Sequence, residues 1–129
     1  MIVLDTPALI SWLSGRGDLC AETREVIDRS LRAREIAISV ISLLDTGQYV
    51  HDGRLEPSVS TRSWLSGLAL IDGIRLVAVD TIIAARAAAL STMLSSHQRL
   101  IAAIATTLAG VLVTLDTRMR EIAYVETIW

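Results

Sequence analysis

The sequence contains a single cysteine, Cys20, and therefore has no second thiol with which to form an internal disulfide. A lone thiol fits a reducing compartment, and we expect a cytoplasmic protein. No basic segment precedes the apolar residues of the opening MIVLDT, and Asp5 interrupts them at once, so we expect no signal peptide. The longest weakly polar run, residues 100–115, is shorter than the roughly 20 residues that span a bilayer. We therefore expect no membrane association.

Lysine is also absent, and all twelve cationic residues are arginine. Arginine makes bidentate contacts with phosphate and carboxylate groups better than lysine does. The formal net charge of −2 argues against nucleic-acid binding by bulk charge, but it leaves room for a local basic groove. Hydrophobic residues make up 52% of the chain, which provides a core and leaves apolar surface that a partner could cover.

The chain shows no repeat and no linker, and its length predicts one domain over residues 1–129. Short apolar runs predict strands, and patterns of period 3.6 between them predict helices. The predicted strands cover residues 2–4, 36–39, 74–79 and 111–113, with an edge strand within 124–128. The predicted helices cover residues 8–13, 21–34, 42–50, 61–70, 81–94, 96–108 and 117–123. This alternation predicts an α/β sandwich with a largely parallel sheet of four to five strands.

Three residues are assigned to helix ends from capping rules. Ser60 and Asp80 are expected to cap the starts of the helices that follow them. Gly110 is expected to take the left-handed conformation that closes the helix over residues 96–108.

Three acidic residues occupy related places in this pattern. Asp5 follows the first strand, Asp116 follows the fourth, and Asp45 lies in the helix after the second. Ligands bind beyond the carboxyl ends of parallel strands, so we expect the three carboxylates to converge. Unpaired carboxylates repel one another, and a hard divalent cation such as Mg²⁺ or Mn²⁺ removes that cost. The pattern predicts a metal site able to act on a phosphodiester.

The same residue type also caps helices, which is the competing interpretation. Asp116 is open to both readings. For Asp5 the metal site is the favoured interpretation, because Thr6 is also available to cap the helix that begins near Pro7. From spacing alone, a metal site and helix capping both stay open.

The segments IVLDTPALI, AISVISLLD and RLIAAIATTLAGVLVTLDTRM carry the three acids, and VETIW ends the chain. In this order and spacing they resemble the PIN domain family, and in particular the VapC-type toxins of bacterial toxin–antitoxin systems. The resemblance implies a three-layer α/β/α fold and a Mg²⁺- or Mn²⁺-dependent endoribonuclease that hydrolyses RNA phosphodiester bonds. It also implies a homodimer, and a cognate antitoxin protein that covers and neutralises the active site.

Carried over residue by residue, the resemblance implies that Asp5, Asp45 and Asp116 are catalytic, as metal ligands or as residues that position the metal's water. Thr6 and Thr114 would support these ligands or contact phosphate. Asp45 stands where the family usually has the longer Glu, so a water between Asp45 and the metal is expected.

Gln98 is the clearest departure from the family pattern. Relatives usually have an acid there, and often another at the position of Ser95. Gln98 could offer a metal a neutral oxygen but no charge, and it is grouped with Thr6 and Thr114 as a supporting or phosphate-contacting residue. A charge at about 4 Å is worth at most roughly 4 kcal/mol. Weak metal binding is therefore expected. An alternative function also stays open, a PIN-like module that binds an antitoxin or RNA without cleaving it.

Other candidates are given ordinary roles. His97 points about 100° away from Gln98 on its helix and is interpreted as a solvated or capping residue. Trp12 and Trp64 fall among apolar helical positions and are interpreted as packing residues rather than as platforms for RNA bases.

Overall fold

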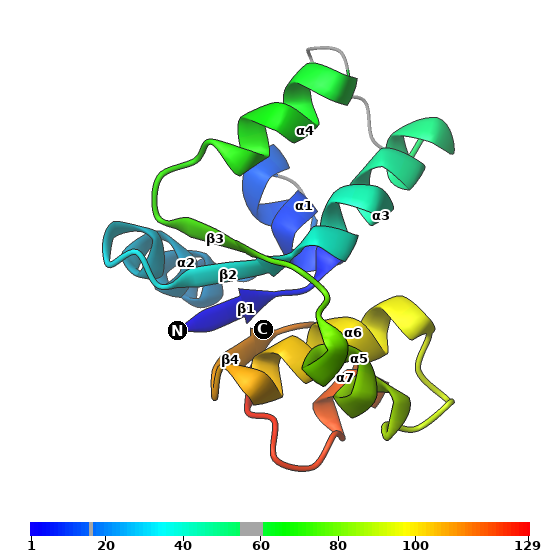
Figure 1. Ribbon diagram of the computed structural model, residues 1–129. Coiled ribbons are helices and arrows are strands. Elements are labelled where there is room, and N and C mark those ends of the chain that lie inside the picture. The colour runs from blue at the N-terminus through cyan, green and yellow to red at the C-terminus, as the bar shows by residue number, and fades with distance from the viewer. Residues whose placement is uncertain (16, 55–60) are drawn as a thin grey trace.

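The computed structural model describes residues 1–15, 17–54 and 61–129, without the side chains of residues 61, 62, 64 and 65. Across these residues a five-stranded parallel sheet runs through the molecule, and helices cover both of its faces (Figure 1). The three-layer α/β/α architecture predicted from the sequence is confirmed. The predicted cap at Ser60 and the side chain of Trp64 lie outside the described residues. No helix in the described ranges is long and apolar enough to cross a membrane.

The strands are short and the helices are of moderate length. The strands are β1 (Ile2–Leu4), β2 (Ile36–Ser39), β3 (Ile74–Val77), β4 (Val111–Val113) and β5 (Thr127–Ile128). The helices are α1 (Thr6–Ser14), α2 (Ala21–Arg32), α3 (Val40–His51), α4 (Thr61–Ala69), α5 (Thr81–Ala88), α6 (Ser96–Thr107) and α7 (Thr117–Arg120).

Alternate residues of each central strand contribute to two separate cores. Val3 and Ala37 face the core formed with α5 and α6, whereas Leu4 and Ile38 face the core formed with α1 and α2. In Figure 1, α5, α6 and α7 lie below the sheet and α1, α3 and α4 lie above it. Because both faces are covered, every residue of β1 and β2 is buried. This explains why β1 is apolar throughout and β2 is apolar up to its last residue, Ser39.

The order of the strands determines where the functional residues meet. The sheet has the order β3-β2-β1-β4-β5, so β1 lies between β2 and β4. Leu4 is in register with Ile38 on one side and with Val113 on the other. The residues that follow these three strands therefore emerge side by side at one edge of the sheet.

Several helix ends differ from the prediction. α3 begins at Val40 rather than Ser42, because the Ser39 side chain caps it by accepting from the N–H of Ile41. α5 ends at Ala88 rather than Leu94. Leu94 is buried although it lies outside the helix, which explains why the apolar pattern continued to that residue. α7 ends at Arg120 rather than Ala123.

The prediction for Gly110 is wrong. Ala109 has the positive φ, 49°, at the end of α6. A Cβ atom on Gly110 would lie 3.1 Å from the carbonyl oxygen of Met1. Glycine is needed here for the close approach of the chain that enters β1, not for a left-handed conformation.

Two other local predictions are confirmed. Asp80 caps α5 by accepting from the N–H of Ile83 at 2.8 Å. Trp12 packs against the core formed with α1 and α2, and its indole N–H donates to Asp28 at 2.9 Å.

Candidate active site

A cavity of about 570 Å³ opens where β1 and β4 end, and all three predicted acids line it. Thr6 and Gln98, also predicted from the sequence, line it as well. Thr114 is not a lining residue: it is fully buried, and its hydroxyl accepts from the backbone N–H of Asp116 at 3.1 Å. The remaining lining residues are Pro7, Tyr49, Ser95, His97, Ile101, Leu115, Arg118 and Met119.

Asp5 caps α1 and is buried at the same time. Its side chain is 3% exposed, and Oδ1 accepts from the N–H of Ala8 at 2.8 Å. Burial raises the pKa of Asp5 to about 6, the negative charge of Asp116 adds to the rise, and hydrogen bonds from Thr114 and Ala8 oppose it. Thr6, which the sequence left open as a cap, does not serve as one: it is the first residue of α1, and Asp5 caps that helix. Capping and a position in the cavity are compatible for Asp5.

Asp45 reaches the cavity from the second turn of α3. The Thr6 hydroxyl donates to Asp45 Oδ2 at 2.8 Å and lies 3.1 Å from the hydroxyl of Ser42. Ser42 is fully buried, and its carbonyl accepts from the hydroxyl of Thr46 at 2.7 Å. This hydrogen-bond network ties the first turn of α1 to α3 and fixes one oxygen of Asp45.

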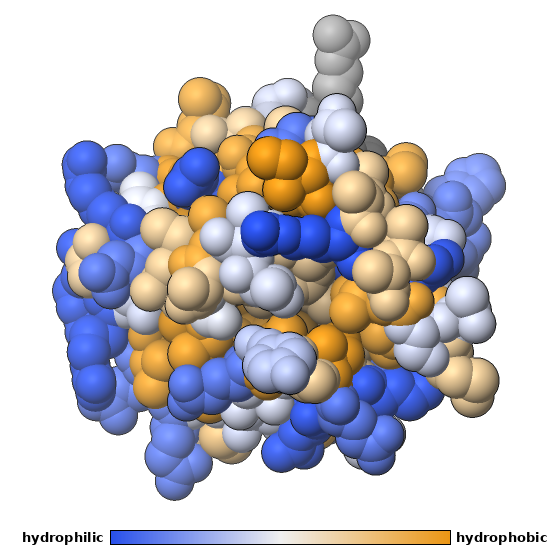
Figure 2. Space-filling model, turned by 60° about the horizontal axis from the view of Figure 1, so that its bottom comes forward, coloured by the Kyte–Doolittle hydropathy of each residue, from blue (hydrophilic) through white to orange (hydrophobic). Residues whose placement is uncertain are grey.

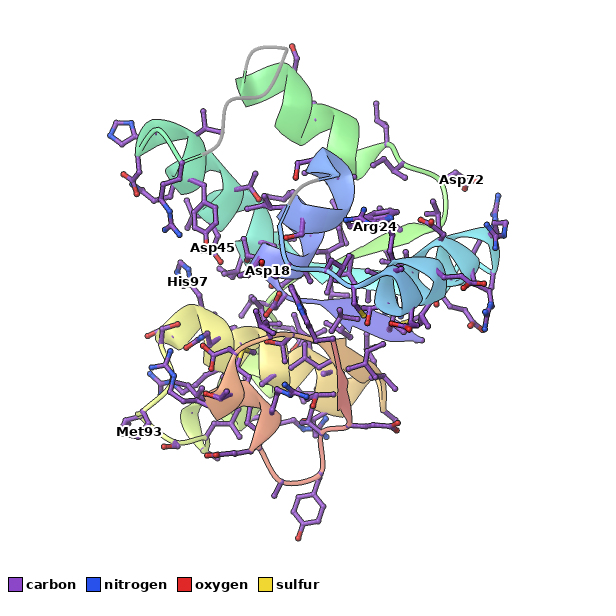
Figure 3. All side chains as sticks on the ribbon, turned by 180° about the vertical axis from the view of Figure 1, so that it is seen from behind. Asp18, Arg24, Asp45, Asp72, Met93 and His97 are labelled. Carbon is purple, nitrogen blue, oxygen red and sulfur yellow. The ribbon has the colours of Figure 1, made fainter. Side chains whose placement is uncertain are left out.

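His97 was missed by the sequence analysis as a partner of the acids. Its Nδ1 pairs with Oδ1 of Asp45, and Figure 3 shows the two side chains pointing toward each other from α6 and α3. The side chain of His97 is 43% exposed, which agrees with its interpretation as a solvated residue, but its contact with Asp45 was not predicted. An ionised carboxylate only accepts hydrogen bonds, so opposite the Asp45 anion the His97 ring is the donor through Nδ1. The contact depends on the packing of α3 against α6, for which the sequence near His97 holds no signal.

Asp116 is surrounded by donors. As the cap of α7, it accepts through Oδ1 from the backbone N–H groups of Arg118 at 2.9 Å and Met119 at 3.2 Å. Its Oδ2 accepts from Nη2 of Arg118 at 3.0 Å and from Nε2 of Gln98 at 2.9 Å. The hydrogen bond from the Arg118 side chain, followed by those from the two backbone N–H groups and from Gln98, holds the pKa of Asp116 below its ordinary value, although partial burial opposes the shift.

The orientation of the Gln98 amide follows from a capping box. Ser95 Oγ accepts from the N–H of Gln98 at 3.1 Å, and Gln98 Oε1 accepts from the N–H of Ser95 at 3.0 Å. Because the backbone N–H can only donate, the oxygen must face Ser95 and the NH₂ group must face Asp116. The oxygen that Gln98 could have offered to a metal thus accepts from the backbone N–H of Ser95 instead. The spacing Ser-x-x-Gln could have revealed this from the sequence.

The cavity offers the right kind of ligand for a hard divalent cation. Among the residues that the structure describes, no group of three or more His, Cys, Asp or Glu side chains could hold a metal ion. Mg²⁺ often keeps several waters, however, and uses one or two carboxylates together with substrate phosphates. Asp5 and Asp116 fit such an ion, since both line the cavity and the charge of one raises the pKa of the other. Ligation by Asp45 stays a prediction.

Several solved structures share this fold. DNA-bound VapBC from Salmonella typhimurium contains a chain with 17% identity and a TM-score of 0.68, with 98% of this chain and 96% of that chain covered. A toxin–antitoxin complex from Klebsiella pneumoniae contains one with 23% identity and a TM-score of 0.61, with 100% and 97% covered. FitAB bound to an IR36 DNA fragment contains one with 22% identity and a TM-score of 0.70, with 99% and 94% covered.

A search of curated protein sequences gave no significant match. The model of the PIN domain family matches residues 2–124, which is nearly the whole chain. With its parallel sheet and the acids that line the cavity at the sheet's carboxyl edge, this protein belongs to the PIN domain family.

Proposed function

We propose that this protein is a divalent-metal-dependent endoribonuclease toxin, which hydrolyses RNA phosphodiester bonds and is neutralised by a cognate antitoxin. The observation that carries this proposal is the cavity of about 570 Å³ with Asp5, Asp45 and Asp116 in its wall. Membership of the PIN domain family supports it, and structures of the same fold include toxin–antitoxin complexes.

In this proposal Asp5 and Asp116 hold Mg²⁺ or Mn²⁺. When bound, the ion supplies an activated water and stabilises the charge that develops at phosphorus. Asp45, held by Thr6, orients the imidazole of His97 at the cavity wall. Arg118 and Tyr49 also line the cavity, and a guanidinium and an aromatic ring suit a phosphate and a nucleobase respectively.

The surface supports a protein partner. Large apolar side chains are exposed on several elements, among them Leu44 on α3, Ile82 on α5 and Met93 before α6. Figure 2 shows apolar patches between charged side chains on the face that carries the lower helices of Figure 1. Such surface is available for the proposed antitoxin and for a homodimer. A cytoplasmic location fits the single cysteine.

RNA cleavage by purified protein tests the proposal. Mn²⁺ and Mg²⁺ are each compared with EDTA, and the Asp5→Asn variant is purified in parallel. Asn keeps an oxygen that can accept from Ala8 and cap α1, so the variant separates loss of charge from loss of fold. We expect metal-dependent cleavage that Asp5→Asn abolishes. Cleavage that needs no metal and survives this substitution would contradict the proposed function.

A second candidate function is favoured by the contacts of Asp116. Arg118 and Gln98 both donate to Oδ2 of Asp116, which leaves that oxygen less available to a metal ion. In this second candidate the domain binds RNA or an antitoxin without cleaving RNA. This candidate predicts no cleavage and no thermal shift with Mn²⁺ for the parent protein. Gln98→Asp separates the two functions: it raises an existing rate under the first and creates activity from none under the second.

A further inference from the structure

Arg118 makes a two-pronged contact with Asp116. Nη2 of Arg118 lies 3.0 Å from Oδ2 of Asp116, and Nε lies 3.4 Å from Oδ1. The guanidinium therefore faces both oxygens of a carboxylate that we propose as a metal ligand. Among the described residues that line the cavity, Arg118 is the only arginine.

The other donors to Asp116 belong to fixed structure. The N–H groups of Arg118 and Met119 are the first turn of α7, and the Gln98 amide is held by its capping box with Ser95. A cation that binds Asp116 must displace one of these donors. The Arg118 side chain can leave without breaking a helix end. It is 54% exposed, and besides Asp116 it donates to the carbonyl of Met93 at 3.3 Å, a long hydrogen bond on the exposed surface. Ion pairs exposed to this degree contribute little to stability, so its departure costs little.

We propose that Arg118 occupies Asp116 in place of the divalent cation, and that it moves from Asp116 to an RNA phosphate when the cation binds. The ion replaces the positive charge of the guanidinium beside Asp116. The released guanidinium can then bind the phosphate, which is another anion that accepts two parallel hydrogen bonds. Arg118 lies two residues beyond Asp116, so its side chain stays beside the cavity during the exchange. This inference rests on the proposed function in naming RNA and the metal as ligands, but not on cleavage.

The exchange has two consequences of opposite sign. Removing the guanidinium frees Asp116 for the ion, so the Arg118→Gln variant should bind Mn²⁺ more tightly, by about tenfold. The same variant loses the phosphate contact that forms once the ion is bound, so RNA binding at saturating Mn²⁺ should weaken and its log–log salt slope should fall by about one. In EDTA, where Arg118 stays on Asp116, RNA binding should change little. A residue that served only to cap or brace α7 would not produce this pair of changes.

The experiment is a calorimetric titration with Mn²⁺ alone, beside fluorescence anisotropy of a labelled single-stranded RNA with hydrolysis-resistant phosphorothioate linkages. The anisotropy is measured at saturating Mn²⁺ and in EDTA, each at several salt concentrations. Arg120→Gln is the matched control, since Arg120 is on the same helix and does not line the cavity. We expect neither quantity to change in that control. If Arg118→Gln does not fold, Arg118→Lys replaces it. Lysine keeps the positive charge but cannot make the bidentate contact with Asp116, so Mn²⁺ affinity should rise while RNA binding is largely retained.

An unchanged or reduced Mn²⁺ affinity in the Arg118 variants overturns the exchange, and so does the absence of Mn²⁺ binding in every variant. Unchanged RNA binding of Arg118→Gln at saturating Mn²⁺ also overturns it, and so does an equal loss of RNA binding in EDTA. Cleavage is measured separately. A parent protein that binds Mn²⁺ without cutting RNA contradicts the proposed nuclease and leaves the exchange intact.

Discussion

Gln98 donates its side-chain amide to Asp116 at 2.9 Å while its oxygen accepts from the backbone of Ser95 at 3.0 Å. One side chain thus closes the start of α6 and supplies a neutral donor to a candidate metal ligand. An acid at position 98 could still accept from the backbone of Ser95. It would, however, replace the hydrogen bond to Asp116 with a repulsion between two carboxylates. We therefore expect the residue at position 98 to influence how strongly the cavity binds a cation.

Gln98→Glu is expected to make stability depend on metal. Glu keeps the oxygen that accepts from Ser95, and it places a second carboxylate oxygen against Asp116. We expect a loss of about 1 kcal/mol in EDTA, which Mn²⁺ reverses with a larger thermal shift than in the parent. The control is Gln48→Glu, because Gln48 donates to Asp52 at 2.9 Å on the exposed surface. Equal Mn²⁺ shifts in the two variants would rule out this role for position 98.

Asp5→Asn is expected to stabilise the fold at neutral pH. The pKa of Asp5 is raised from 3.8 to about 6, so the folded state holds this proton more tightly than the unfolded state. The stability of the parent therefore falls as the pH rises from about 4 to 6, a loss that Asn avoids. We expect the variant to be more stable by as much as about 3 kcal/mol at pH 7.5. Urea unfolding at several pH values measures this gain, which should vanish near pH 4.

Thr6→Val tests the hydrogen-bond network between α1 and α3. The substitution preserves shape but removes a buried hydroxyl that donates to Asp45 at 2.8 Å. The free energy of unfolding should fall by about 1–3 kcal/mol, since the partners of the hydroxyl stay in the protein. Thr106→Val is the control, because the hydroxyl of Thr106 is on the surface and donates only within its own helix. Equal losses of unfolding free energy in the two variants would show that the hydrogen bonds of Thr6 to α3 add no stability beyond that of a hydroxyl bonded within its own helix.

Tyr49→Leu is expected to weaken RNA binding. Tyr49 lines the cavity, and the guanidinium of Arg54 lies 4.1 Å from the centre of its ring. A ring braced in this way can stack a base, so its loss should reduce affinity about tenfold in EDTA. The chain's other tyrosine, Tyr124, is fully exposed and does not line the cavity, so Tyr124→Leu is the matched control. Anisotropy with a labelled RNA compares the two, and equal affinities would argue against a base at Tyr49.

The strands could be located from the sequence because both faces of this sheet are covered. β1, β2 and β4 have the predicted bounds, since strands covered on both sides form nearly continuous apolar runs. Helix ends were less accurate, because burial continues beyond the last helical turn. Leu94 kept the apolar pattern in a loop, and Gly110 suggested a conformation that Ala109 adopts. Patterns of hydrophobicity report burial, and hydrogen bonds decide where a helix stops.

The sequence by itself determined the strands, the alternation with helices, and the places of Asp5, Asp45 and Asp116 relative to strand ends. Only the tertiary structure decided that β1 lies between β2 and β4, and that α3 packs against α6. That packing brings His97 to Asp45, 52 residues away. It also brings Gln98, at the start of α6, to Asp116, at the start of α7. The reason is physical: local sequence fixes the hydrogen bonds of one element, whereas contacts between side chains of different elements depend on how those elements pack.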